Sequence, residues 1–228
     1  MGTGLERFRH IAVEGPIGAG KTSLARRLAD HLGAEVLLEQ PTENPFLERF
    51  YADRAGYALQ TQLAFLFQRV RQMEAIAQPS VFGRAVVSDF LFAKDAIFAR
   101  LNLSDEEHRL YRQFFSQLAP QVPEPDVIVW LQAPVPVLLQ RIRQRGIAME
   151  RAVDSSYLEH LCAAYADYFA GYEAAPVLVV VTERFNPAEQ DADFERLLLA
   201  LSTFEGRRAL LEPDRPQPFL GPERLADL

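Results

Sequence analysis

Cysteine is almost missing from this chain of 228 residues, in which Cys162 stands alone. No intrachain disulfide can form, and this favours a reducing compartment, the cytoplasm. Cys162 lies in an apolar stretch of helical character, so we expect it to be a small packing residue. The four histidines lie far apart and lack the spacing of metal ligands.

Long apolar runs are also missing. No run approaches the roughly 20 residues that a membrane-spanning helix needs. The N-terminal residues do not show the charged and then apolar layout of a signal peptide. The sequence therefore predicts no membrane partner.

An excess of positive charge is absent as well, because the formal net charge is -7 and the pI is about 5.2. A nucleic-acid polymer calls for a broad basic face, so we exclude it as the main partner. A small anionic ligand needs only a local group of cations and stays compatible with this charge.

Lysine is the scarcest charged residue: of 24 basic residues only Lys21 and Lys94 are lysines. In a chain that uses arginine by default, a remaining lysine indicates a place where a compact ammonium is required, which makes both positions candidates for a site. For Lys94 alone, an ordinary solvated surface position is an equal alternative.

Five short apolar runs predict buried parallel strands, because each is nearly continuous instead of alternating. They are Ile11 to Val13 with its flanks, Glu35 to Leu38, Ala85 to Val87, Val127 to Leu131 and Val177 to Val181. Helical patterns lie between them, at Ser23 to Leu32 and at Tyr57 to Ala77. The alternation predicts one α/β domain over residues 1–204, a three-layer sandwich with a five-stranded parallel sheet flanked by helices. Residues 205–228 carry four prolines and predict an irregular tail.

Three helix starts are marked by their residues. Ser104 with Glu107 forms a capping box, Asp154 can cap a helix from Ser155, and Asn186 followed by Pro187 predicts a cap and a first helical position.

A glycine-rich motif, G-x-x-x-x-G-K-T, runs from Gly15 to Thr22, between a predicted strand and a predicted helix. Its backbone N–H groups can cradle phosphates, Lys21 can reach the outer phosphates and Thr22 can ligate Mg²⁺. This P-loop context predicts a nucleotide site for ATP with Mg²⁺. The residues assigned to it are Gly15, Pro16, Ile17, Gly18, Ala19, Gly20, Lys21, Thr22 and Ser23.

Two carboxylates follow predicted strands at the same edge of the sheet. Glu39 comes after Leu38 and can accept the proton of an attacking hydroxyl, although a solvated loop glutamate is an equal alternative from position alone. Asp89 ends the strand that begins at Ala85, and an acid there can face Mg²⁺ opposite Thr22.

The chain resembles the deoxynucleoside kinase family, most closely its bacterial deoxyadenosine/deoxyguanosine kinase branch. The resemblance extends over about residues 9–200 and is carried by the runs Ile11 to Thr22, Glu43 to Tyr51 and Leu59 to Gln62, together with Glu39. It implies ATP-dependent phosphorylation of the 5′-hydroxyl of a deoxynucleoside in nucleotide salvage, with purines favoured, and a homodimer formed through helices such as Tyr57 to Ala77.

The resemblance also implies a role for each matching residue. Glu39 is the general base and Gln60 pairs with the edge of the nucleobase. Tyr51 and Glu150 contact the sugar 3′-hydroxyl, and Asp95 helps to hold the base. Taken singly, Tyr51 has the alternative of a half-buried packing residue and Asp95 that of a helix-start carboxylate, and the joint match makes both alternatives weaker.

An arginine-rich segment at about residues 141–153 predicts a lid, with Gly146 as its hinge. Arg141 and Arg145 match the lid arginines of the family and are expected to stabilise the transferring phosphoryl group. The alternative is a solvated cationic helix face. The loop from Thr182 to Asn186 is expected to embrace the ATP base.

Two positions depart from the family pattern. The arginine that usually follows the acid at position 89 is Phe90 here, and Lys94 is the hypothesised replacement. One lid arginine of the family is Ile147. Two alternative functions stay open. One is a nucleoside monophosphate kinase of the thymidylate kinase type, against which the missing arginine at Phe90 argues, and the other is a nucleotide-binding protein without turnover, against which Lys21, Glu39 and the lid arginines argue.

Overall fold

A six-stranded sheet organises the computed structural model, which describes residues 4–77, 84–118 and 122–212. The strand order is β2-β3-β1-β4-β5-β6, and each neighbouring pair is parallel. The predicted parallel α/β sheet is confirmed, but the predicted count of five strands was one too low. The strands are β1 His10–Glu14, β2 Glu35–Leu37, β3 Val86–Ser88, β4 Val127–Gln132, β5 Val177–Val181 and β6 Arg208–Leu211.

The sixth strand lies in the stretch that was expected to be an irregular tail. β6 pairs with β5 through Val177 to Val180. Only Ala209 and Leu211 of β6 are buried, because the strand lies at the edge of the sheet. Its apolar run, Ala209 to Leu211, is only three residues long and lies next to the prolines of the tail, so it was not recognised as a strand. The sheet thus continues beyond residue 204, and the prolines of the predicted tail lie outside the described residues.

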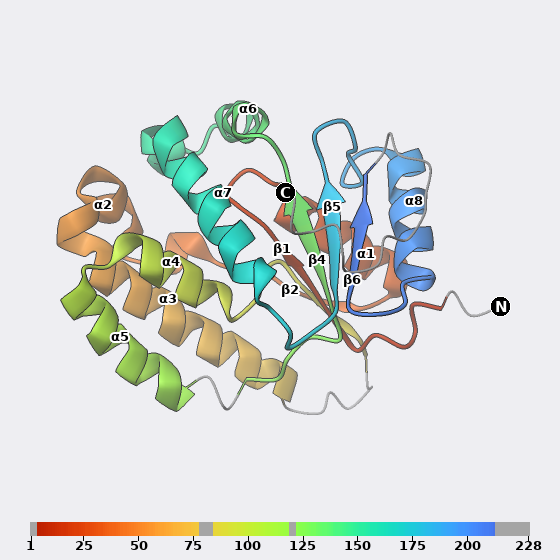
Figure 1. The fold of residues 1–228 in the computed structure, drawn as a ribbon, viewed down its shortest axis with the longest axis horizontal. Helices are drawn as coiled ribbons and strands as arrows, with labels where there is room; N and C mark the ends of the chain where they lie inside the picture. The colour runs from red at the N-terminus through yellow and green to blue at the C-terminus, as the bar shows by residue number, and fades with distance from the viewer. Residues whose placement is uncertain (1–3, 78–83, 119–121, 213–228) are drawn as a thin grey trace.

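Helices cover both faces of the sheet (Figure 1). On one face, His31 of α1 packs edge-on against Phe194 of α8, with ring centroids 5.6 Å apart. On the other face, Trp130 of β4 stacks on Phe169 of α7 at 4.4 Å, and α4, α3 and α5 follow outside α7. The helices are α1 Lys21–Leu32, α2 Leu47–Ala52, α3 Arg54–Ala77, α4 Lys94–Asn102, α5 Asp105–Leu118, α6 Val135–Arg145, α7 Ser155–Ala170 and α8 Asp191–Ser202, with 3-10 turns η1 Pro41–Glu43 and η3 Ala148–Ala152. None of these helices is both long and apolar enough to cross a membrane.

Two of the three predicted helix starts are confirmed. At α5, Ser104 N–H donates to Glu107 (2.9 Å) and Glu107 N–H donates to the Ser104 hydroxyl (3.3 Å), the two bonds of a capping box. At α7, Asp154 accepts from Tyr157 N–H at 2.7 Å. The third prediction was wrong, because α8 begins at Asp191 and the side chain of Asn186 donates to Glu189 instead of accepting from a helix N–H.

The order of the strands determines where a ligand can bind. β1 lies between β3 and β4, and its five residues are all buried. Because the strands are parallel, the segments that follow them meet at one edge of the sheet. In an open α/β sheet, this carboxyl edge is where ligands bind.

Candidate active site

A cavity of about 820 Å³ opens at the carboxyl edge of the sheet, a size typical of small-molecule sites. Its walls come from the loop after β1, the segment after β2, helices α3 and α4, the α6–η3 segment and the loop after β5. Most of the predicted site residues meet in this one cavity. They are Ile17, Gly18, Ala19, Gly20, Lys21, Thr22, Ser23, Glu39, Tyr51, Asp89, Lys94, Arg141, Arg145 and Glu150.

The glycine-rich loop curls between β1 and α1. Gly15 and Gly18 both have positive φ, 154° and 85°. A Cβ added at Gly15 would lie 2.6 Å from the backbone oxygen of Leu131, so a side chain cannot be accommodated there. Gly15 and Pro16 are not part of the cavity wall. Their carbonyls accept from the Lys21 ammonium at 2.8 and 3.1 Å.

Lys21 is a half-buried cation where this loop meets α1. Burial, together with the nearby charge of Lys94, lowers the pKa of Lys21 to about 8, while Glu14, Glu39 and Asp89 oppose the shift. The ammonium is thus surrounded by carboxylates and lies at the end of the cavity where the P-loop is found.

Asp89 connects the P-loop to the segment after β2. Its Oδ2 accepts from the Thr22 hydroxyl at 2.6 Å, and its Oδ1 accepts from the Glu39 N–H at 2.7 Å. One carboxylate thereby fixes the position of Thr22 relative to the backbone of Glu39. Both residues line the cavity.

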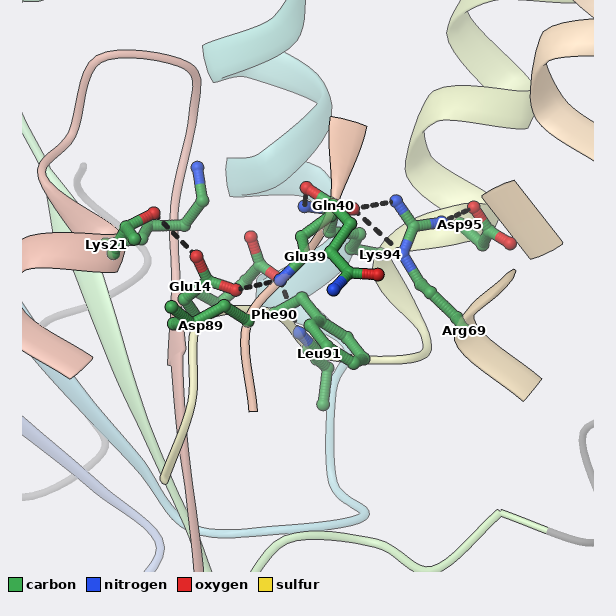
Figure 2. A network of polar contacts seen from close by, with 12 residues as sticks. Glu14, Lys21, Glu39, Gln40, Arg69, Asp89, Phe90, Leu91, Lys94 and Asp95 are labelled. Carbon is green, nitrogen blue, oxygen red and sulfur yellow. Dashed lines mark hydrogen bonds and ion pairs between the residues drawn. The ribbon is translucent and has the colours of Figure 1, made fainter. Parts of the chain in front are cut away.

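Glu39 is held between two cations (Figure 2). Lys94 Nζ lies 3.0 Å from Oε2. Arg69 contacts Oε1 through Nε at 3.1 Å and also through Nη2. Burial alone would raise the pKa of Glu39, but Lys94 and Arg69 outweigh it and hold this pKa well below its usual range. Glu39 is therefore an ionised acceptor in the cavity wall, with only 15% of its side chain exposed.

Arg69 continues this network to Asp95, which is fully buried (Figure 2). Gln62 donates its amide to Asp95 Oδ1 at 2.7 Å and to the Asp95 carbonyl at 3.1 Å. Burial raises the pKa of Asp95 to about 6, against the effect of Arg69. Gln62 and Arg69 line the cavity, whereas Asp95 lies behind them and orients both.

The predicted sugar contacts and the lid arginines close another part of the cavity. Arg145 donates to both oxygens of Glu150, at 2.6 and 2.5 Å. Tyr51 lines the same cavity, and burial raises its pKa. Arg141 is directed away from this pair: it donates to the carbonyl and hydroxyl of Thr182 at 2.6 and 3.1 Å, in the loop after β5.

Comparison with known proteins identifies the family. The sequence model of the deoxynucleoside kinase family matches residues 11–204 of this chain. The chain belongs to the deoxynucleoside kinase family. This membership makes it a phosphotransferase and confirms the resemblance found in the sequence.

Relatives and solved structures agree with this assignment. The chain is 34% identical to a deoxyguanosine kinase of Bacillus subtilis over 192 residues, which cover 82% of this chain and 93% of the relative. It is 30% identical to a deoxyadenosine/deoxycytidine kinase of the same organism over 195 residues, 82% of this chain and 89% of the relative. A structure of deoxyadenosine kinase from M. mycoides with bound dCTP shares the fold, with a TM-score of 0.72, 23% identity and coverage of 86% of this chain and all of the other.

The glutamine predicted to meet the nucleobase was placed on the wrong side of a helix of this kinase. Gln60 is exposed and is not part of the cavity wall, whereas Gln62 is 4% exposed and lines it. Residues two apart in an α-helix differ by about 200° around its axis, so only one of the two can face the site. The sequence run contained both glutamines, but it did not show which face α3 turns inward.

Arg69 is a site residue that was not predicted from the sequence. Its side chain is only 4% exposed and it contacts both Glu39 and Asp95. Arg69 follows Gln62 by seven residues, two helical turns, so both lie on one face of α3. This spacing was the available signal, but Gln60 had been chosen in place of Gln62.

Phe90, at the position of the family arginine, does not reach the site. It is 1% exposed and packs in an apolar cluster with Leu66, Val70 and Met73. Lys94, one helical turn farther along, reaches Glu39 instead. The structure therefore places two cations beside Glu39, Lys94 and Arg69, and the replacement of the family arginine by Lys94 stays a hypothesis.

Oxygen ligands for a metal are few here. Among the described residues, no group of three or more His, Cys, Asp or Glu side chains could hold a metal ion. Thr22 and Asp89 provide one hydroxyl and one carboxylate, 2.6 Å apart. This donor set suits Mg²⁺, which commonly uses few protein ligands and takes the others from phosphates and water.

Proposed function

We propose that this kinase transfers the γ-phosphoryl group of ATP to the 5′-hydroxyl of a purine deoxynucleoside, deoxyguanosine or deoxyadenosine. One observation carries the proposal: Glu39, an ionised carboxylate, shares a single cavity with the P-loop, and Asp89 connects the two. A hydroxyl bound between Glu39 and the P-loop would face the terminal phosphate. The two Bacillus subtilis relatives, a deoxyguanosine kinase and a deoxyadenosine/deoxycytidine kinase, support this choice of substrates.

In this mechanism, the protein residues position the reactants and stabilise charge. Glu39 accepts the proton of the 5′-hydroxyl as the oxygen attacks. Lys94 and Arg69 hold the Glu39 carboxylate in place, and Lys21 binds the outer phosphates. Closure of the segment at about residues 141–153 would bring Arg145 toward the phosphates, where it opposes the charge of the transferring group.

Thr22 and Asp89 are the residues that would hold Mg²⁺. When bound, the metal neutralises phosphate charge. Removal of divalent ions with EDTA is expected to abolish product formation, and Mg²⁺ in excess should restore it. Full turnover in the presence of EDTA, with the metal content of the protein measured as zero, would contradict this assignment.

Nucleobase recognition is assigned to Gln62, Arg69 and Asp95. Both amide hydrogens of Gln62 are directed to Asp95, so its carbonyl oxygen remains as an acceptor for an amino or N–H group of the base. Arg69 would supply a hydrogen-bond donor to the base. A purine with an exocyclic amino group offers the matching donor, consistent with deoxyadenosine or deoxyguanosine as substrate.

The test is a product assay with ATP and each deoxynucleoside in turn, run on the wild type and on Glu39→Gln. Loss of a positioned general base is expected to lower kcat about 10²-fold to 10⁴-fold, with the affinity for ATP retained. Deoxynucleoside monophosphates serve as parallel acceptors. Phosphorylation of dAMP or dTMP without phosphorylation of any nucleoside would instead support a monophosphate kinase.

We further propose a homodimer formed through α3 and α5, which lie side by side at the outer edge of the molecule (Figure 1). Phe67 of α3 and Phe114 of α5 make an edge-on contact at 6.3 Å. Both remain exposed, at 45% and 37%, as does Leu110 of α5 at 42%. Such apolar exposure on adjacent helices is typical of a protein–protein interface.

Sedimentation equilibrium tests the dimer. The double variant Phe67→Glu and Phe114→Glu is expected to be monomeric. Leu199→Glu is the matched control, because Leu199 is 60% exposed but lies on α8, away from this surface. A wild type that is monomeric, or a double variant that still dimerises, would overturn the proposal.

A further inference from the structure

Glu14 is a buried carboxylate with no role in the mechanism described above. It is the last residue of β1 and is 0% exposed. Its Oε1 accepts from the Gly15 N–H at 2.8 Å and from the Tyr165 hydroxyl at 2.9 Å. Its Oε2 accepts from the Leu91 N–H at 2.6 Å. Figure 2 shows Glu14 and Leu91 together with the network around Glu39.

The three donors come from three segments that build the cavity. Gly15 begins the P-loop. Leu91 lies in the turn between Asp89 and Lys94. Tyr165 belongs to α7, the helix that follows the arginine-rich segment. A single carboxylate thus connects the phosphate side, the Glu39 side and the helix beyond the lid.

Tyr165 extends this connection toward the predicted nucleoside end. Its ring packs edge-on against Phe98 of α4, with centroids 6.3 Å apart. Phe98 lines the cavity, and Lys94 Nζ lies 5.8 Å from the centroid of its ring. A shift of Tyr165 would therefore displace Phe98 and, through it, the Lys94 ammonium that holds Glu39.

We infer that Glu14 is a positioning residue for phosphoryl transfer, which sets the P-loop, the Asp89–Lys94 turn and helix α7 in one fixed arrangement. The chemistry calls for a carboxylate. Three donors converge on two acceptor oxygens, whereas an amide has only one oxygen and would turn an N–H₂ group toward at least one backbone N–H. A buried donor left in this way costs far more than the bond itself is worth.

The inference rests on the proposed phosphoryl transfer, so the product assay of the wild type and Glu39→Gln comes first. The test then measures kcat and both KM values for Glu14→Asp, Glu14→Gln and Tyr165→Phe. Tyr172→Phe is the control: the Tyr172 hydroxyl also donates to a glutamate, Glu124, at 3.1 Å, but Glu124 is exposed and lies outside the cavity. Thermal unfolding of every variant is recorded in parallel.

The expected result is a fall in kcat of about threefold to tenfold for Tyr165→Phe, the size of one lost hydrogen bond expressed as a rate. Tyr172→Phe should keep the kinetic constants of the wild type. Glu14→Gln should lose at least tenfold in kcat/KM for both substrates, and Glu14→Asp, which keeps the carboxylate, should recover part of it.

A different pattern overturns the inference. If Tyr165→Phe loses stability but, like Tyr172→Phe, keeps wild-type kinetics, then Glu14 and Tyr165 only stabilise the fold. The same conclusion follows if Glu14→Asp is no more active than Glu14→Gln. Should Glu14→Gln fail to fold, the Tyr165→Phe comparison still decides. Absence of nucleoside phosphorylation by the wild type would instead refute the proposed function itself.

Discussion

The two lysines of the chain both lie in the active-site cavity, Lys21 in the P-loop and Lys94 beside Glu39. Lys94 is 3% exposed, so its stem fills a narrow space that the broader guanidinium of an arginine would not fit without displacement. The scarcity of lysine was thus a useful signal, although chance alone explained it equally well before the fold was known.

Lys94→Ala is expected to lower kcat about 10-fold to 100-fold, because Glu39 loses one of the two cations that hold it. The KM for ATP should change little, since Lys94 contacts Glu39 and not the P-loop. Arg100→Ala is the control on the same helix: Arg100 is 72% exposed and pairs loosely with Asp105. Steady-state kinetics of both variants provide the measurement, and unchanged turnover in Lys94→Ala would refute the role.

The two glutamines of α3 give a second test at the level of single residues. Gln62→Ala should raise the KM for the deoxynucleoside by about 10-fold or more, because a buried partner of Asp95 and a contact to the base are lost together. Gln60→Ala should behave as the wild type, since Gln60 is exposed. Equal effects of the two substitutions on nucleoside KM would contradict the assignment of Gln62.

Residues close together in the sequence were the easiest to predict. The P-loop residues needed only their neighbours, because a motif of fixed spacing requires one local geometry. For Glu39, the position after a strand left two alternatives equal, and the resemblance to the family decided between them. Arg69 and Gln62 depended on which face of α3 turns toward the segment after β2. That choice is made by contacts between residues far apart in the chain, so a single sequence could not show it.

Among the elements, helix α7 depends on its cap. Asp154→Ala should lower the free energy of unfolding by about 1 kcal/mol, because the Tyr157 N–H loses its acceptor. Asp154→Asn keeps an oxygen at that point and should retain most of the stability. Urea denaturation of the three proteins compares these values. If the alanine and asparagine variants are equally destabilised, the loose ion pair of Asp154 with Arg54, at 3.7 Å, is responsible instead.

The predictability of the elements follows from how they are buried. β1, β4 and β5 are covered on both faces, so their apolar runs were continuous and their positions were found. β6 is an edge strand buried only at alternate residues, and its apolar run, Ala209 to Leu211, was too short to separate from a loop. The pair Asn186 and Pro187 predicted a helix start, but the chain forms a turn there and α8 begins later, at Asp191.

At the scale of the whole molecule, charge is distributed unevenly. The chain carries a net charge of -7, yet cations line its cavity: Lys21, Arg69, Lys94, Arg141 and Arg145. Net charge therefore helped to exclude a polymeric nucleic acid but said nothing of the local field that a nucleotide meets. Four of these cations were predicted as site residues from the sequence. Arg69 was recognised as a site residue only in the structure.

The free energy of unfolding should depend on pH through the protonation of His10, a buried residue of the central strand. His10 is 6% exposed, and its Nε2 lies 2.9 Å from the Ser88 hydroxyl. Burial lowers the pKa of His10 from 6.5 to about 4, against the effect of Asp126. The unfolded chain therefore binds a proton at higher pH than the folded protein does. The contribution of the neutral His10 to the free energy of unfolding is fully present above pH 6.5, and it is lost as the pH falls toward 4.

The loss is expected to reach about 3 kcal/mol near pH 4, because one pKa unit corresponds to about 1.4 kcal/mol. His10→Gln keeps a polar side chain near Ser88 but cannot titrate, so its deficit against the wild type should shrink as the solution is acidified. Urea unfolding at intervals between pH 7.5 and 4.5 measures this difference. His160→Gln, at an exposed position of α7, controls for the general acid sensitivity of the carboxylates. A deficit of His10→Gln that stays constant over this range would show that His10 takes up its proton equally well in the folded protein.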